Sequence, residues 1–250
     1  MDARHELAEL VRLTVRAVAQ QKDNGIESVR LPDDLTALFT DPRAVTPPAA
    51  SPAPRSDATS LQALYDANCT CTKCPLGHTR RHFVFGSGNE HAEVMFIGEA
   101  PGAEEDAQGL PFVGAAGQLL TKILEAIKFN RDEVYIANIV KCRPPNNREP
   151  RPEEMAACEP ILREQIRLIQ PKLICALGRV AGQALLRTTA PLGRLRGTFH
   201  DYHGIKVLVT YHPAALLRDP SLKRPTWEDV QKLRREYDQL MEFTTKAQRT

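Results

Sequence analysis

The chain has 250 residues, 42% of them hydrophobic, and a formal net charge of only +2 at pH 7. This length allows one substantial core with appendages, and the small charge means that any nucleic-acid surface must come from local clusters of Lys and Arg. No run approaches the ~18 apolar residues of a membrane span, and the N-terminus has acidic residues where a signal peptide needs an apolar stretch. We therefore expect a cytoplasmic protein without a membrane partner.

An amphipathic helix is predicted over about residues 4–21, because apolar residues from Leu7 to Val18 recur on one face at helical spacing. Residues 45–60 are rich in Pro, Ala and Ser and have no periodicity, which is typical of a flexible linker. We therefore predict an N-terminal helical appendage over residues 1–44, the linker over 45–60 and one main domain over 61–250. The protein partner of the appendage is unknown.

From residue 61 onward, apolar strands alternate with helical patterns. This alternation indicates an α/β fold, and the near-continuous apolar character of the strands indicates a sheet that is parallel at its centre. Strands are predicted at residues 94–97, 134–137, 173–177 and 205–210, and helices near 115–128, 152–169, 179–187 and 226–242.

Three unusual loops each follow a predicted strand directly, at residues 98–106, 138–150 and 211–218. In parallel α/β sheets the carboxyl ends of the strands meet at one edge, and the working groups lie on the loops there. We therefore expect these three loops to form one site.

Six cysteines in a reducing compartment are better interpreted as metal ligands or buried thiols than as disulfides. Cys71 and Cys74 form a C-x-x-C pair, Cys142 lies in the second loop, and Cys158 lies in the helix that follows. Zinc also accepts four cysteines, but structural zinc sites usually use two close pairs. An iron-sulfur cluster tolerates this irregular spacing better.

The other two cysteines have simpler interpretations. Cys175 lies in an apolar strand and is expected to be a core thiol, whereas Cys69 is close enough to Cys71 to replace it as a ligand. His91 and Glu93 match H-x-E, the first motif of the zinc deaminases. That motif should precede a P-C-x-x-C, and here it follows a C-x-x-C without the proline, so we reject a deaminase.

The loops and cysteines together resemble the family 4 uracil-DNA glycosylases, the iron-sulfur branch of the uracil-DNA glycosylase superfamily. The resemblance covers roughly residues 61–250, and its strength is the order and spacing of four motifs. These motifs are Gly98-Glu99-Ala100-Pro101-Gly102, Pro111-Phe112-Val113-Gly114 with Ala116-Gly117, Asn138 to Arg148, and Tyr211-His212-Pro213-Ala214.

The resemblance implies a three-layer α/β/α sandwich with a central four-stranded parallel sheet, and a catalytic domain over residues 61–250 that removes uracil from DNA. It also implies a [4Fe-4S] cluster. Because hydrolysis needs no electron transfer, we expect the cluster to have a structural role in fixing the second loop, with redox sensing as the alternative. We expect the chain to act as a monomer on uracil-containing DNA. The implied cluster ligands are Cys71, Cys74, Cys142 and Cys158.

The resemblance also implies how the extruded base is bound. Phe112 resembles the aromatic residue that stacks on uracil, although the local sequence is equally typical of a core Phe. Asn138 ends a strand, where its amide offers both a donor and an acceptor to the base edge. The predicted substrate-binding residues are Gly98, Ala100, Phe112, Asn138 and Asn147.

Bond cleavage leaves an anion on uracil and cationic character on the sugar, so a donor to the uracil oxygen and a positioned water both accelerate it. His212 is the expected donor. Other superfamily branches have an Asp after the residue that corresponds to Glu99; here Ala100 takes that place and cannot activate water. Glu99 and Glu105 are therefore the candidates for positioning the water and stabilising the sugar cation.

Local basic clusters can bind phosphates even where the net charge is small. Such clusters lie in the second loop, in the Gly-bounded loop near residue 195 and after Leu217, whose side chain is also a candidate wedge for the space left by the base. The predicted DNA contacts are Lys141, Arg143, Arg148, Arg196, Leu217 and Arg218.

Two alternatives keep the fold but change the activity. One is a protein that traps uracil-DNA covalently; its relatives carry a His-bearing basic insertion near the third cysteine, and residues 141–150 contain no His. The other is a non-catalytic domain associated with a DNA polymerase, which the presence of Glu99, Asn138 and His212 argues against.

Overall fold

The computed structural model describes residues 58–247, and the structural statements below concern this part of the chain. The predicted appendage over residues 1–44 lies outside the described residues, and so does most of the predicted linker over 45–60.

A six-stranded sheet forms the centre of the fold, with strand order β1-β3-β2-β4-β6-β5. The four middle strands are parallel, which confirms the predicted central sheet, and an antiparallel strand extends it at each edge. The strands are β1 (Ser87–Gly88), β2 (Val94–Gly98), β3 (Tyr135–Asn138), β4 (Leu173–Leu177), β5 (Phe199–Tyr202) and β6 (Ile205–Thr210).

Helices connect the parallel strands, as is usual for the crossover connections that parallel strands need. None of the helices within residues 58–247 is long and apolar enough to cross a bilayer. The α-helices are α3 (Leu61–Asp66), α4 (Ala103–Gln108), α5 (Ala115–Ala126), α6 (Pro152–Ile169), α7 (Arg179–Leu186), α8 (Leu192–Leu195), α9 (Pro213–Arg218) and α10 (Lys223–Ala247), and the 3-10 helices are η1 (Pro75–His78), η2 (Pro145–Asn147) and η3 (Pro220–Leu222).

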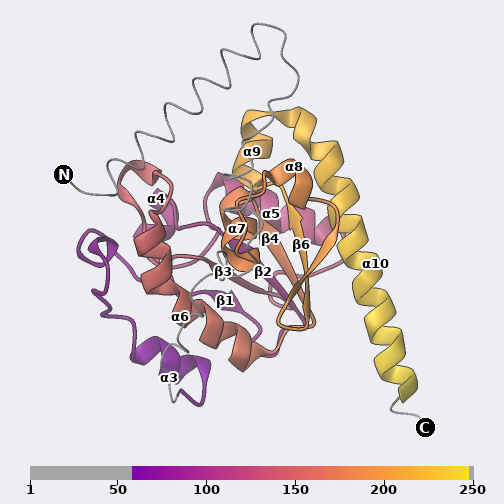
Figure 1. Ribbon diagram of the computed structural model, residues 1–250, viewed down its shortest axis with the longest axis horizontal. Helices are drawn as coiled ribbons and strands as arrows, with labels where there is room; N and C mark the ends of the chain where they lie inside the picture. The colour runs from indigo at the N-terminus through magenta and orange to yellow at the C-terminus, as the bar shows by residue number, and fades with distance from the viewer. Residues whose placement is uncertain (1–57, 248–250) are drawn as a thin grey trace, which may run out of the picture. The chain divides into compact units, whose positions relative to one another are not determined.

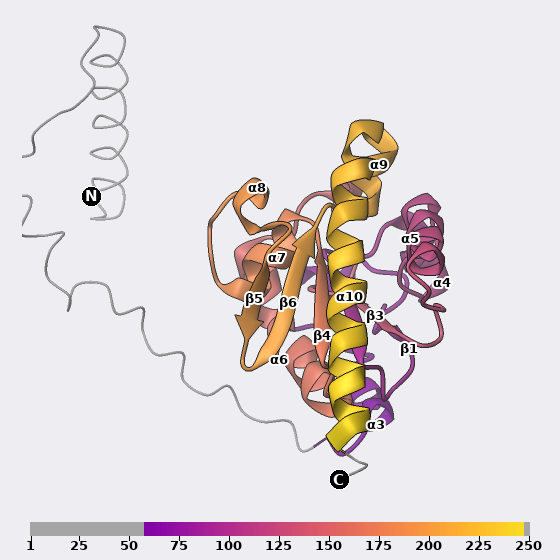
Figure 2. The same cartoon turned by 90° about the vertical axis from the view of Figure 1, so that its right-hand side faces the viewer.

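The helices cover both faces of the sheet and produce three layers. On β2, Met95 and Ile97 pack with α3, α6 and α7, whereas Val94 and Phe96 pack with α5 and α10. This alternation explains why the central strands are apolar at successive positions. Figure 1 shows α6 and α10 on opposite sides of the sheet, and in Figure 2 α10 crosses in front of it.

The carboxyl ends of the parallel strands meet at one edge of the sheet. Gly98 at the end of β2 pairs with Asn138 at the end of β3, and Leu177 at the end of β4 pairs with Thr210 at the end of β6. The loops that follow continue the ladder, because Ile139 donates its N–H to the Gly98 carbonyl. The three predicted loops therefore begin side by side.

Candidate active site

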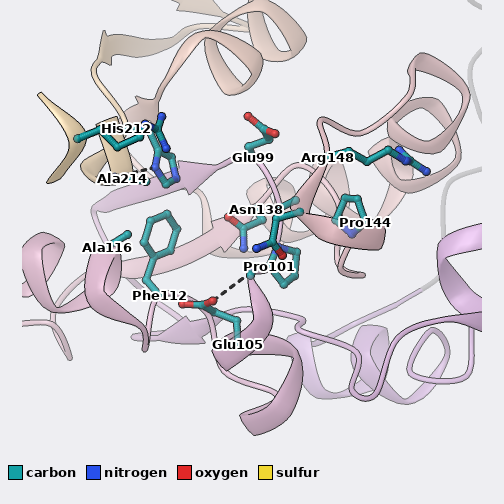
Figure 3. A pocket seen from close by; sticks show the side chains of 14 residues that line it. Glu99, Pro101, Glu105, Phe112, Ala116, Asn138, Pro144, Arg148, His212 and Ala214 are labelled. Atoms are coloured by element: carbon teal, nitrogen blue, oxygen red, sulfur yellow. Dashed lines mark hydrogen bonds between the residues drawn. The ribbon is translucent and has the colours of Figure 1, made fainter. Parts of the chain in front are cut away.

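A pocket opens at this carboxyl edge, and all three predicted loops contribute to it (Figure 3). Glu99 comes from the loop after β2, Asn138 from the end of β3, and His212 from the loop after β6. The lining residues are Glu99, Ala100, Pro101, Gly102, Glu105, Phe112, Ala116, Asn138, Pro144, Asn147, Arg148, His212, Ala214 and Arg218.

Asn138 lies at the floor of the pocket with an unpaired acceptor. Its side chain is buried, and within the described residues its Oδ1 atom has no hydrogen-bond partner. A buried polar atom without a partner costs about 1–3 kcal/mol, so a ligand that donates an N–H to Oδ1 recovers that cost. Gly98 makes the arrangement possible, because a Cβ there would lie 2.5 Å from Asn138 Oδ1 and 2.5 Å from Phe112 Cζ.

Phe112 forms one wall of the pocket and has a backbone φ of 53°, in the left-handed region that non-glycine residues rarely adopt. Glu105 holds this turn. Its Oε1 accepts the N–H groups of Val113 (2.9 Å) and Gly114 (3.0 Å), and its Oε2 accepts that of Gly102 (3.1 Å). Strained backbone persists only where its surroundings fix it, and Glu105 supplies these restraints.

These three bonds correct the prediction for Glu105. Both carboxylate oxygens are occupied by backbone N–H groups, so Glu105 positions the Phe112 turn and the start of α4, and it is not kept as a water-positioning group. The sequence did not reveal this, because a Glu at the start of a helix is equally typical of a catalytic loop and of a backbone cap.

His212 precedes α9, and its ring faces Phe112 with centroids 5.5 Å apart. The Ala214 N–H donates to its Nδ1 atom over 3.1 Å. Burial and, to a smaller extent, the charge of Arg218 together lower the pKa of His212 to about 4, against the opposing charge of Glu105. The ring is therefore neutral at pH 7, and because Nδ1 is the acceptor, Nε2 carries the hydrogen.

Glu99 provides the carboxylate opposite His212 (Figure 3). Burial raises its pKa, the charge of Glu149 raises it further, and the charge of Arg179 opposes this effect. Arg179 and Glu149 form an ion pair that joins the start of α7 to the second loop. A carboxylate in such surroundings is the expected partner for a water molecule or a developing cation.

Lys141 and Arg196 do not lie where we predicted. Lys141 is fully buried, and its ammonium donates to the Asn138 carbonyl (2.8 Å) and to Gln165 Oε1 (2.6 Å), so no phosphate can reach it. The guanidinium of Arg196 is bonded to Asp229 and to the Pro225 carbonyl. We therefore withdraw both as DNA contacts: Lys141 supports the β3 loop, and Arg196 ties α10 to the sheet.

The remaining basic residues lie around the pocket. Arg148 and Arg218 line it, and Arg143 donates from Nε to the Asn147 side chain over 2.8 Å. Arg148 is held by a bidentate ion pair with Glu154, which is almost fully buried at the start of α6. The side chain of Leu217 is 50% exposed.

The four predicted cysteine ligands come from three segments that converge. Burial raises the pKa of the Cys142 thiol; Arg80 lowers it, and the nearby Cys74 and Cys71 raise it. Burial raises the pKa of the Cys158 thiol to about 11; Lys141 opposes this shift, and Cys142 and Cys74 add to it. Within residues 58–247, no group of three or more His, Cys, Asp or Glu side chains is placed to hold one metal ion. Cys175 is fully buried in β4, which confirms it as a core thiol.

Two N–H groups donate hydrogen bonds to these sulfurs. Lys141 N–H donates to Cys158 Sγ over 3.4 Å, and Arg80 Nη1 donates to Cys142 Sγ over 3.3 Å. Arg80 also donates to the carbonyls of Cys71 (2.6 Å) and Cys69 (2.9 Å). N–H···S bonds of this kind are typical around iron-sulfur clusters.

Several of these residues were missed by the sequence analysis. Arg80, Gln165 and Arg179 act through contacts with residues distant in the chain, so no local spacing reveals them. Glu154 pairs with the nearby Arg148, but the turn that brings the two side chains together has no helical or strand periodicity. Among them, only Arg80 could have been found from the sequence, because a basic residue six positions after the C-x-x-C pair is close enough to donate to the ligand sulfurs.

The fold and the pocket define an α/β/α protein with a polar and aromatic pocket at the carboxyl edge of its sheet. The model of the uracil DNA glycosylase superfamily matches residues 85–233. The chain therefore belongs to this superfamily.

Individual relatives place it more closely. The chain is 44% identical over 184 residues to a type-4 uracil-DNA glycosylase of Saccharolobus solfataricus, covering 70% of this chain and 85% of the relative. It is 44% identical over 182 residues to that of Archaeoglobus fulgidus (70% and 92%), and 47% identical over 166 residues to that of Thermotoga maritima (65% and 86%). Within the superfamily, the chain belongs to the type-4 uracil-DNA glycosylases.

Proposed function

We propose that the protein removes uracil from DNA by hydrolysing the bond between the base and its deoxyribose, which leaves an abasic site. A base inside a duplex cannot reach a pocket, so the nucleotide must be extruded at a cost of a few kcal/mol. The observation that carries the proposal is the buried, unpaired Oδ1 of Asn138 in the pocket that the Phe112 and His212 rings also line. The type-4 relatives support it.

Asn138 selects uracil by its hydrogen-bonding pattern. The uracil N3–H donates to Oδ1, and the Asn138 Nδ2 amide donates to uracil O4. Cytosine has no N3–H and presents an amino group where uracil has O4, so it leaves both sides unpaired. Unpaired polar groups in a site built for hydrogen bonding give strong discrimination. Phe112 stacks on the base, and Ala100 and Asn147 complete the pocket.

His212 stabilises the leaving group. As the N1–C1′ bond breaks, its electron pair moves into the uracil ring, and the neutral Nε2–H donates to the O2 atom where negative charge develops. A neutral donor already bears its hydrogen and needs no proton from solution. The Arg218 charge that lowers the pKa of His212 also favours the uracil anion.

Glu99 acts on the sugar side of the breaking bond. Its carboxyl group stabilises the positive charge on the sugar and orients the water whose oxygen bonds to C1′. The water loses a proton to solvent as the new C1′–O bond forms, and the uracil anion takes up a proton from solvent at N1. We propose that Arg143 and Arg218 bind phosphates and that Leu217 occupies the space vacated by the base, whereas Arg148, which is paired with Glu154, shapes the pocket rim.

Cys71, Cys74, Cys142 and Cys158 would hold a [4Fe-4S] cluster. Their convergence and the two N–H···S donors support this assignment. The cluster would join the C-x-x-C segment, the second loop and α6, and hydrolysis needs no electron from it. Zinc is the alternative, which iron and acid-labile sulfide analysis distinguishes.

The experiment uses an oligonucleotide with one uracil, alkali treatment to break the abasic site, and a thymine control. Wild-type protein is expected to cleave only the uracil strand. His212→Ala should lose most of this activity, whereas His203→Ala, in the exposed turn between β5 and β6, should retain it. A protein-DNA adduct that survives denaturation would favour trapping, and no turnover by iron-loaded protein would favour an accessory domain.

A further inference from the structure

The junction between α9 and α10 carries an aromatic and basic surface to which the pocket gives no role. We call it the junction surface; it consists of Lys223, Arg224 and Trp227, next to Leu217 and Arg218 of α9. Trp227 is the single tryptophan of the chain, and its side chain is 41% exposed. Figures 1 and 2 both show α9 beside the first turns of α10.

This surface is fixed to the edge of the sheet that holds the pocket. Asp229, two residues after Trp227, accepts a hydrogen bond from the hydroxyl of Thr210 (2.8 Å), the last residue of β6. Arg196 bonds to Asp229 and to the Pro225 carbonyl, and its guanidinium lies 5.2 Å from the ring centre of Tyr211, the neighbour of His212. The first turns of α10 are therefore held against the catalytic loop.

The cations of the junction surface are available to a ligand. The Arg224 side chain is 90% exposed, and its contact with Glu228 is long, at 3.4 Å. In the described part of the chain, neither Arg218 nor Lys223 forms an ion pair. The nearby carboxylate of Asp219 is occupied by Ser221.

An exposed tryptophan among accessible cations suits nucleic acid, because phosphates pair with the cations and a base or sugar packs on the indole. A protein partner would require a larger apolar area than one Trp and one Leu provide. The surface also continues from Leu217 and Arg218, which our proposed function already places against DNA.

We propose that the junction surface binds the DNA segment that flanks the extruded nucleotide, with Lys223 and Arg224 on its phosphates and the Trp227 indole against an exposed base. This inference rests on the proposed function, since it assumes a uracil strand in the pocket. It adds a second contact region, which anchors the strand while the nucleotide is turned out.

The single tryptophan makes the test direct. Wild-type protein is titrated with an oligonucleotide whose 2′-fluoro-deoxyuridine resists cleavage, and Trp227 emission is compared with the anisotropy of a dye on the DNA. We expect the emission to change in parallel with binding. Unchanged emission while anisotropy reports saturation would overturn the inference.

Variants test the cations separately. Lys223→Gln with Arg224→Gln should weaken binding and reduce the slope of log K against log salt by about 2, because each phosphate contact contributes about 0.9. Arg235→Gln, an exposed arginine three turns further along α10, is the matched control and should leave the slope unchanged. Equal slopes in all three proteins would refute the phosphate contacts.

Trp227→Ala should weaken binding at least about fivefold, and Trp227→Phe should restore part of the loss, since a stacked base contributes about 1–3 kcal/mol. Uracil excision by wild type is measured on the same preparation. If the protein excises uracil but shows none of these effects, the junction surface alone is refuted. If the protein neither binds nor excises, the proposed function is refuted as well.

Discussion

The neutral state of the half-buried His212 ring has a measurable consequence for stability. The ordinary pKa of histidine is 6.5, and burial lowers that of His212 to about 4. Below pH 6.5 the unfolded chain binds a proton at this residue that the folded protein does not bind, so acidification favours unfolding. One pKa unit corresponds to about 1.4 kcal/mol, so the full effect approaches about 3 kcal/mol, of which about 2 kcal/mol develops between pH 7 and 4.5.

The matched variant is His212→Asn, whose amide oxygen can accept the Ala214 N–H in place of Nδ1. Urea unfolding of both proteins at pH 7 and pH 4.5 isolates the contribution of the histidine from that of other titrating groups. We expect the unfolding free energy of wild type to fall by about 2 kcal/mol more than that of the variant over this interval. An equal fall in both proteins, or a smaller fall in wild type, would refute the neutral ring.

Three other predictions follow from particular contacts. Gly98→Ala places a Cβ 2.5 Å from both Asn138 Oδ1 and Phe112 Cζ, so it should cost about 1–3 kcal/mol of stability and about 100-fold in excision rate; wild-type kinetics would contradict this. Arg80→Met removes the donor to Cys142 Sγ and should shorten the lifetime of the cluster absorbance in air, whereas Arg81→Met, whose backbone N–H alone bonds to Asp106, should not. A chain without residues 1–57 should excise uracil at the wild-type rate, because every lining residue of the pocket lies between 99 and 218; a large loss would assign the appendage a catalytic role.

The sheet was predictable where both of its faces are buried. The runs at 94–97 and 173–177 are apolar at every position because helices cover both sides, and such runs identify central strands. The edge strands were not foreseen, since β1 has two residues and β5 mixes polar with aromatic residues. Their pairing depends on neighbouring strands, which the local sequence does not encode.

The site was predictable in its positions more than in its roles. Asn138 and His212 were expected at strand ends, and parallel strands bring such ends together. The type of a charged residue, however, does not tell where its side chain points. Glu105 points at backbone N–H groups, and Lys141 points into the core toward Gln165, so both were assigned roles that the structure corrects.

The central claim is that Asn138 selects uracil for excision, and Asn138→Asp tests it most directly because the change is nearly isosteric. The measurement is the single-turnover release of free uracil and free cytosine from matched oligonucleotides. The account predicts that wild type releases uracil alone, and that the variant loses at least about 100-fold in uracil release because a carboxylate cannot donate to O4. Release of uracil by the variant at the wild-type rate would contradict the account.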